Sequence, residues 1–178
     1  AVPPRRGPDE PIPSRAAEAN GGQREGSSPG LPPTEALPGE ETLGRLPVLG
    51  EIERLVPGQE ASIRRTLDLS EDLYLRDHLF IHAPGVKATE ECLPVLPMTV
   101  SMEFMAEAAA LLVPGLGLIG FEEVRATRWI ALENVSSIEL EITAKAAPDS
   151  ARPGVQPVQA AIFCQGKLSA SATVLFGS

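Results

Sequence analysis

The chain contains two histidines, His78 and His82, and each is a candidate general base. A neutral imidazole can remove a proton at working pH because its pKa lies near neutrality. Glu103 is a candidate general acid, since a carboxyl group in an apolar site stays protonated and can donate. These residue types are suited to acid–base chemistry. Without further context, a histidine beside an aspartate, as in Asp77-His78, is more often an ordinary surface or core residue.

Glu103 lies in the segment most clearly predicted to be a helix, residues 97–112. Met, Ala and Leu favour helix there, Pro97 stands at a typical helix start, and Pro114-Gly115 ends it. The segment is apolar nearly all round, so the helix should be buried on most sides. Its polar residues are Thr99, Ser101, Glu103 and Glu107.

Thr99, Glu103 and Glu107 recur at every fourth position and should form a narrow polar stripe along this helix. Two interpretations of the stripe stay open. It is either the solvated edge of the helix, or it places Glu103, in the helix middle, against an active-site cavity.

The other periodic segments predict strands. They are residues 61–69, 117–132, 137–146 and 159–176, with 51–56 as a short strand or turn. Residues 137–146 alternate between apolar and polar side chains, as expected for a strand with one buried face. Residues 72–82 are expected to form a short turn followed by an extended stretch. Together these elements predict an α+β fold, an antiparallel sheet wrapped around one central helix at about 97–112.

Residues 1–45 differ in composition from the rest of the chain. They hold nine of the 18 prolines and seven of the 16 glycines, and no aromatic residue. Such a segment cannot bury enough apolar surface to offset its ordering entropy. We therefore predict a disordered Pro/Gly-rich linker at 1–45 and a folded domain at 46–178.

Charge and composition exclude several classes of function. The net charge of −9 and the pI of about 4.8 argue against a nucleic-acid binder and against a polybasic membrane anchor. No transmembrane run and no secretory leader are recognised. Two cysteines, Cys92 and Cys164, are too few for a disulfide framework or a zinc site, so a reducing, cytoplasmic setting is expected. No cofactor-binding or metal-ligand motif occurs, and none is predicted.

Three stretches carry a resemblance to a known family. They are Leu-Pro-Val-Leu-Gly at 46–50, Tyr-Leu-Arg-Asp-His at 74–78, and Leu-Pro-Val-Leu-Pro-Met-Thr-Val-Ser-Met-Glu at 93–103. Together they resemble the start of a polyketide synthase dehydratase domain. The residues of these stretches are most similar to those of iterative synthases of the polyunsaturated-fatty-acid, enediyne and heterocyst-glycolipid type. The resemblance covers about 46–178 and implies a hotdog fold.

The resemblance also implies roles for particular residues. His78 would be the base that removes the C2 proton of a 3-hydroxyacyl thioester. Pro97, Met98 and Thr99 would bind the thioester at the helix start, where backbone N–H groups lack helical partners. Glu103 would be the acid if a second copy supplies it, because small bacterial dehydratases that resemble this helix use a Glu at that spacing.

The resemblance further implies what the chain works with. Dehydratases of these synthases are double hotdogs with His in one half and Asp in the other, and this chain is long enough for one half. The substrate would be carried on the phosphopantetheine of an acyl carrier protein. Expected partners are that carrier, a second hotdog half or homodimer partner, and neighbouring synthase domains.

The spacing of the histidines departs from the family pattern. The usual dehydratase signature places His eight residues before the helix-entry Pro, whereas His78 lies nineteen and His82 fifteen residues before Pro97. An insertion is therefore predicted, and either histidine remains a candidate base. The alternative functions are a non-catalytic dehydratase-like module that serves structure or dimerisation, and a stand-alone hotdog thioesterase or acyl-binding protein.

The remaining charged residues are interpreted as structural. Asp68, Glu71 and Asp72 are expected to be turn or surface carboxylates. A charged patch near Trp129 is expected to be a solvated sheet face or a docking edge for a neighbouring domain. It consists of Glu122, Glu123, Arg125 and Arg128.

Overall fold

A computed structural model of the chain describes residues 46–81, 92–148 and 152–178, without the side chain of Ile81. These residues all belong to one compact unit. The predicted linker at 1–45 and His82 lie outside the described residues, so the predictions about them stay predictions.

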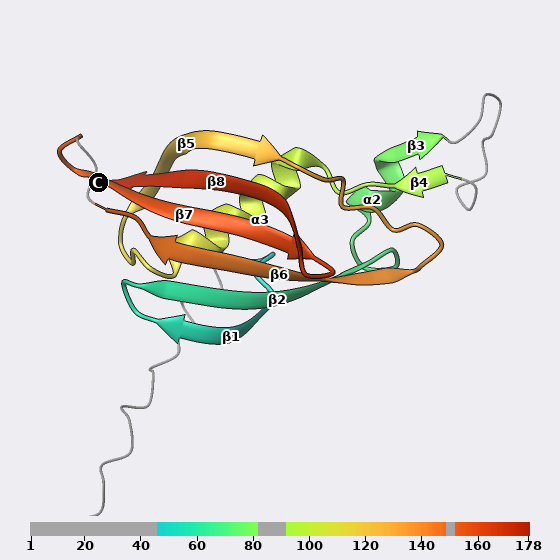
Figure 1. The fold of residues 1–178 in the computed structure, drawn as a ribbon, viewed down its shortest axis with the longest axis horizontal. Helices are drawn as coiled ribbons and strands as arrows, with labels where there is room; N and C mark the ends of the chain where they lie inside the picture. Colours follow the sequence, from blue (N-terminus) through green and yellow to red (C-terminus); the bar gives the residue numbers. More distant parts are fainter. Residues whose placement is uncertain (1–45, 82–91, 149–151) are drawn as a thin grey trace, which may run out of the picture. The chain divides into compact units, whose positions relative to one another are not determined.

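Within the described ranges, six antiparallel strands form the large sheet, in the order β1-β2-β6-β7-β8-β5 (Figure 1). They are β1 (Glu51–Val56), β2 (Glu60–Asp68), β5 (Gly117–Ala126), β6 (Ser137–Ala146), β7 (Val155–Cys164) and β8 (Lys167–Gly177). Two short strands, β3 (Leu79–Ile81) and β4 (Cys92–Pro94), pair with each other beyond one end of the large sheet. The predicted antiparallel sheet is thereby confirmed.

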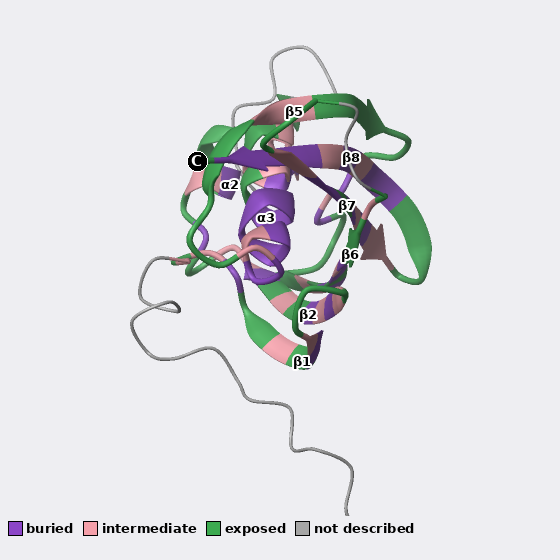
Figure 2. Ribbon diagram, turned by 90° about the vertical axis from the view of Figure 1, so that its left-hand side faces the viewer, coloured by how far each residue is buried: buried purple, intermediate pink, exposed green. Residues whose placement is uncertain are grey.

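The helix α3 (Met98–Ala110) packs along one face of the large sheet (Figure 2). It agrees closely with the predicted helix at 97–112, and most of its residues are buried, as its apolar sequence predicts. A second helix, α2 (Tyr74–Asp77), forms where the sequence predicts a turn. The prediction of one central helix is therefore incomplete, because a short helical turn precedes β3. Neither α2 nor α3 has the length and apolar character that a membrane-spanning helix requires.

The core lies between α3 and the sheet. Ile63, Ile142 and Ile162 are direct neighbours on β2, β6 and β7, and all three are fully buried. Phe104 of α3 is also fully buried. Burying each such side chain contributes about 1.5–3 kcal/mol. On β6 the polar side chains, such as Glu139 and Glu141, face solvent, which is the alternation that the sequence predicts.

The prediction of one long strand at 159–176 is wrong, because the chain turns back at Gln165 and Gly166 to form β7 and β8. Both turn residues have positive φ, 52° and 69°, as a tight two-residue hairpin turn requires. The strand predicted at 117–132 similarly ends at Ala126.

The segment 46–49, which we call the strap, precedes β1 and contacts α3. Gly50 joins the strap to β1 with a φ of 87°, and a Cβ at this position would lie 2.5 Å from the Arg64 carbonyl oxygen. Only glycine fits there without displacing backbone. The turn allows Leu49 to be buried, at 2% exposure, in the core.

Candidate functional site

His78 lies at the junction between α2 and β3, where it caps the C-terminus of the short helix. Its side chain is exposed, but the ring is anchored: Nδ1 donates a hydrogen bond to the Val95 carbonyl oxygen at 2.8 Å. A carbonyl can only accept, so the proton must sit on Nδ1 in the neutral ring. The lone pair is therefore on Nε2. This is the tautomer and orientation that a general base needs.

The Val95 carbonyl is itself fixed by a small sheet. Val95 N–H donates back to the His78 carbonyl oxygen at 3.1 Å, so the two residues are bonded in both directions. On the other side, Val95 bridges to Ala131. Leu96 N–H donates to the Ile130 carbonyl at 2.8 Å, and Leu132 N–H donates to that of Pro94 at 2.9 Å. Segment 130–132 therefore extends the β3–β4 pair and fixes the strand that carries the Val95 carbonyl, the partner of the imidazole.

An aromatic ring, Phe80, contacts the imidazole, and a second, Trp129, contacts Phe80. The Phe80 ring meets the His78 ring edge to face, with centroids 5.7 Å apart and planes at 80°. The Trp129 ring packs on Phe80, with centroids 4.7 Å apart and planes at 36°. Both rings are solvent-accessible, Phe80 at 43% and Trp129 at 65%. An exposed aromatic pair thus begins at the candidate base.

The predicted thioester-binding residues lie at the start of α3. Pro97 is the N-cap with extended backbone (φ −59°, ψ 141°), and proline has no side-chain acceptor for the first helical N–H groups. Val100 and Ser101 N–H both donate to the Pro97 carbonyl at 3.1 Å. The N–H groups of Met98 and Thr99 are among the first four of the helix and have no intrahelical acceptor. Because Val95 precedes Met98 by three residues, its carbonyl lies within about 10 Å of them.

The structure brings His78 close to the helix start, but it does not join His78 to Glu103. Glu103 is exposed, and among the described residues no hydrogen bond or ion pair connects the two side chains. Glu103 lies about 7.5 Å further along the helix axis than Met98. Within one chain, the described residues therefore do not pair His78 with Glu103 as base and acid.

Glu107 differs from the solvated edge that the polar stripe suggests. It is 3% exposed, beneath the strap, and its two carboxylate oxygens accept the Val48 N–H at 3.0 and 3.3 Å. Burial raises its pKa to about 7, and the nearby charge of Glu103 adds to this, whereas the Val48 N–H and Arg65 act in the opposite direction. The helical spacing predicts the stripe but carries no sign of which segment covers it.

Asp72 also differs from the prediction, because it is a buried carboxylate and not a surface one. It is 5% exposed and accepts hydrogen bonds from Arg65 Nη2 at 2.6 Å, from the Asp68 N–H at 2.9 Å and from the Tyr74 hydroxyl at 3.0 Å. Burial and the bond to Asp72 raise the pKa of Tyr74. The Arg65 guanidinium lies over the Phe104 ring, 5.9 Å from its centroid. This cluster anchors α2, which ends at His78.

Two further features of the described residues concern cysteine chemistry and metal binding. Cys164 packs against the core, and burial raises the pKa of its thiol, which disfavours the reactive thiolate. No cluster of His, Cys, Asp and Glu able to hold a metal ion occurs within 46–81, 92–148 and 152–178.

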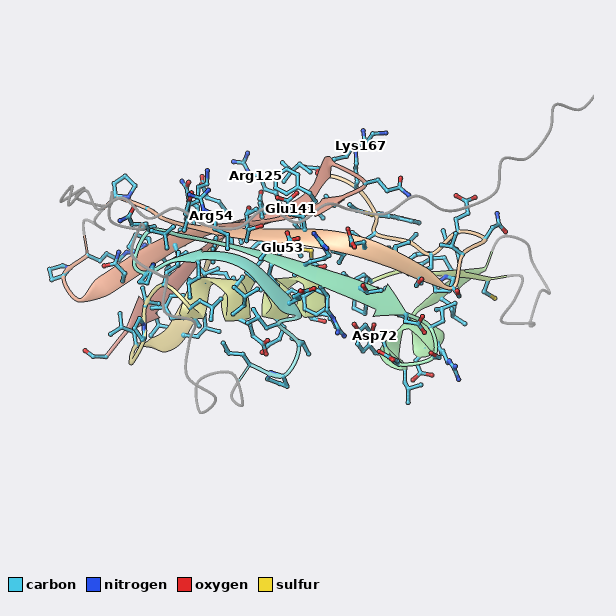
Figure 3. All side chains as sticks on the ribbon, turned by 90° about the horizontal axis from the view of Figure 1, so that it is seen from below. Glu53, Arg54, Asp72, Arg125, Glu141 and Lys167 are labelled. Atoms are coloured by element: carbon cyan, nitrogen blue, oxygen red, sulfur yellow. The ribbon has the colours of Figure 1, made fainter. Side chains whose placement is uncertain are left out.

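The charged patch predicted near Trp129 is exposed. Arg125 lies with Glu141 and Lys167 on the sheet face turned away from α3 (Figure 3).

A comparison of the sequence with protein families finds no matching family, and a comparison with curated proteins finds no significant match. Solved structures are similar in fold. One is the dehydratase heterocomplex ApeI:P from Xenorhabdus doucetiae, with 14% identity, a TM-score of 0.51, and coverage of 75% of this chain and 83% of that chain. Another is the mutant phenylacetic acid degradation protein PaaI from Thermus thermophilus, with 17% identity, a TM-score of 0.51, and coverage of 76% and 99%.

The dehydratase domain from the CurK module of the curacin polyketide synthase is similar as well, with 14% identity and a TM-score of 0.52. The match covers 74% of this chain but 44% of that domain. These neighbours are hotdog proteins, and the chain has the hotdog fold, an antiparallel sheet with a helix packed on it. At such identities the likeness concerns the fold alone.

Proposed function

We propose that the chain is one hotdog unit of a 3-hydroxyacyl-thioester dehydratase, of the kind found in iterative polyketide or fatty acid synthases. The observation that carries the proposal is the anchored imidazole of His78. Its Nδ1 is bonded to the Val95 carbonyl at 2.8 Å, its Nε2 has no hydrogen-bond partner among the described residues, and the residue is exposed near the start of α3.

In the proposed reaction, His78 Nε2 takes the proton from C2 of the substrate. The electrons of the C2–H bond form the C2–C3 double bond, and the C3 hydroxyl leaves as water after an acid protonates it. The N–H groups of Met98 and Thr99 polarise the thioester carbonyl, which stabilises the negative charge that develops when C2 loses its proton. The acyl group is carried on the phosphopantetheine of an acyl carrier protein.

The acid comes from a second hotdog. Within one chain Glu103 is exposed, as the solvated-edge interpretation predicts, so it serves as the acid only where a second copy covers it and brings it to that copy's His78. Two sources remain distinct: Glu103 of a second copy, or an Asp of a different hotdog half. The CurK domain, of which this chain matches 44%, is long enough to hold a second unit of this size.

The edge strand β5 is the proposed meeting point for that second hotdog. It ends the strand order and pairs only with β8 in the described part of the sheet. Its exposed apolar side chains are Leu118 (47%), Ile119 (56%) and Val124 (39%). An unpaired edge with apolar side chains favours pairing with another strand. Ile119→Lys places a charge on this edge and should lower the sedimentation coefficient toward the value of a monomer. Lys145→Ala, on the interior strand β6, should leave the sedimentation coefficient unchanged.

The test of the function is dehydration of 3-hydroxyacyl thioesters, loaded on a carrier protein and followed by the ultraviolet absorbance of the conjugated product. The assay is run with the chain alone and together with any hotdog encoded downstream. His78→Ala should lower the rate by roughly a hundredfold or more, because it removes the base. Glu139→Gln, a solvent-facing control, should leave the rate unchanged.

Glu103→Gln separates the two sources of the acid. A loss as large as that of His78→Ala assigns the acid to Glu103 of a second copy. Full activity in Glu103→Gln, with His78→Ala inactive, assigns it to another hotdog half. Full activity in His78→Ala would overturn the catalytic proposal and favour the non-catalytic module, for which the supporting observation is that Glu103 is exposed and not bonded to His78 among the described residues.

A further inference from the structure

The exposed pair Phe80 and Trp129 is not used by the chemistry described so far. The chain has one tryptophan and five phenylalanines, and its single tryptophan is 65% exposed. Phe80, at 43%, is also largely exposed. Stacked aromatic rings that remain accessible are typical of binding surfaces, because they offer apolar area at low conformational cost.

The position of the pair indicates what it binds. Phe80 touches the candidate base directly, edge to face at 5.7 Å, and Trp129 continues the surface at 4.7 Å from Phe80. A substrate whose C2 proton is within reach of Nε2 therefore has its next carbons near these rings. Phe80 lies on β3 of the small sheet, and Trp129 directly precedes the segment 130–132 that is hydrogen-bonded to this sheet, so the backbone near both rings is fixed.

We propose that Phe80 and Trp129 form an acyl-contact surface, which binds the first carbons of the substrate's apolar chain beyond the reacting centre. The inference rests on the proposed function, because it takes the ligand to be an acyl thioester. The two rings then select for chain length, through apolar area removed from water.

The surroundings of Trp129 limit how far the contact extends. Trp129 also lines an open groove of about 670 Å³ on the sheet. The charged side chains of this groove are Arg128, Glu133, Glu139, Glu141 and Lys167. A long apolar chain gains little by entering such a polar groove. The gain from added carbons should therefore level off once the chain has passed the two rings.

Binding can be measured without turnover, by Trp129 fluorescence. The probes are saturated pantetheine thioesters that lack the 3-hydroxyl group: butanoyl, hexanoyl, octanoyl and decanoyl. Since Trp129 is the only tryptophan, any change in its emission reports on this surface. We expect the dissociation constant to fall by about two- to fourfold per methylene over the short homologues and then to level off.

Variants separate chain contact from other roles. Phe80→Ala should weaken octanoyl binding by about tenfold and butanoyl binding much less, and Phe80→Leu should restore most of the loss. Leu116→Ala is the matched control, because Leu116 is 37% exposed but follows the opposite end of α3. It should change neither constant. Trp129→Ala is followed by calorimetry and should resemble Phe80→Ala.

Each outcome decides the inference. Equal losses for short and long chains in Phe80→Ala, or a dissociation constant that does not depend on chain length, would overturn it. So would a fall in kcat with unchanged KM, which would make Phe80 a positioning residue for His78. Chain-length-dependent binding without dehydration of the 3-hydroxy analogues would uphold the acyl-contact surface and overturn the dehydratase proposal. Dehydration without chain-length-dependent binding would uphold the dehydratase proposal and overturn the acyl-contact surface.

Discussion

Glu103 and Glu107 are one turn apart on α3, yet they lie in two different surroundings. Glu107 is 3% exposed, lies under the strap and accepts the Val48 N–H, whereas Glu103 faces solvent. The same contrast holds for the aromatic residues: Phe104 is fully buried against the large sheet, and Phe80 is 43% exposed on the small one. Between α3 and the large sheet, Phe104 and Glu107 have their contacts within the chain. At the small sheet, Phe80 and Trp129 stay exposed.

This difference has a functional meaning. A buried carboxylate that is covered and bonded serves the fold, because removing it would leave its donors unsatisfied. Exposed aromatic rings, and an anchored imidazole whose Nε2 has no partner within the described part of the chain, add no stability to the fold that smaller residues would not supply. The open region is therefore the place where a ligand or a second hotdog would supply the missing contacts.

The strongest way to test the comparison is the same substitution in both regions. Phe104→Ala should lower the free energy of unfolding by about 3–5 kcal/mol, because it leaves a cavity in the core. Phe80→Ala should lower it by less than about 1 kcal/mol, because the residue is 43% exposed and its loss leaves no cavity in the core. Urea denaturation at fixed pH measures both. Similar losses would mean that the small sheet belongs to the same packed core.

The next effect concerns the carboxylate that anchors α2. Asp72→Ala should lower the free energy of unfolding by about 2–3 kcal/mol, since it leaves the Arg65 guanidinium without its partner in a largely buried site. The control is Glu139→Ala, whose ion pair with Arg64 joins side chains 65% and 47% exposed. That pair should contribute less than about 0.5 kcal/mol. Equal changes in the two variants would contradict the assignment of Asp72 as an interior group.

A third prediction uses the proton of Glu107. In the unfolded chain its pKa returns to 4.5, and in the folded chain it is about 7. The folded state thus binds more protons than the unfolded state within this window, so the free energy of unfolding falls as pH rises through it. The loss contributed by this group is on the order of 3 kcal/mol. Above the window the loss is complete.

Glu107→Gln keeps an acceptor for the Val48 N–H but cannot ionise. Its free energy of unfolding should vary less with pH over this window, and it should exceed that of the parent chain at slightly alkaline pH. Denaturant titrations of both proteins over the pH range give the difference directly. Because other groups titrate equally in both, parallel curves would show that Glu107 is not perturbed in the folded state.

Much of the fold follows from local pattern. The strand Ser137–Ala146 has the bounds that its alternation predicts, and α3 differs from the predicted helix only at its ends. Both are set by short-range periodicity and by proline and glycine at the boundaries. The burial of Glu107 has no such local sign, because the residue that covers it, Val48, lies 59 positions away in the sequence.

Part of the candidate site can likewise be predicted from the sequence. His78 and the helix start at Pro97 stand out by residue type and by a family resemblance. The carbonyl partner of His78, on Val95, is seventeen positions away and is a backbone group, which carries no side-chain signature. The sequence marks Trp129 only as a neighbour of charged residues, since its contact with Phe80 depends on pairing between segments far apart in the chain.

The smallest expected effect concerns the hairpin turn between β7 and β8. Gln165 has a φ of 52° and Gly166 one of 69°, a pair of conformations that Asn-Gly adopts more readily than Gln-Gly. Gln165→Asn should therefore raise the free energy of unfolding by about 0.5 kcal/mol, and Gly166→Ala should lower it by about 1 kcal/mol.

Gln165 also lines the groove that Trp129 borders. If the two rings, and not the groove, contact the acyl chain, Gln165→Asn should change stability while octanoyl binding, read by Trp129 fluorescence, stays the same. A change in binding as large as that of Phe80→Ala would assign the contact to the groove and remove the distinction between the two regions.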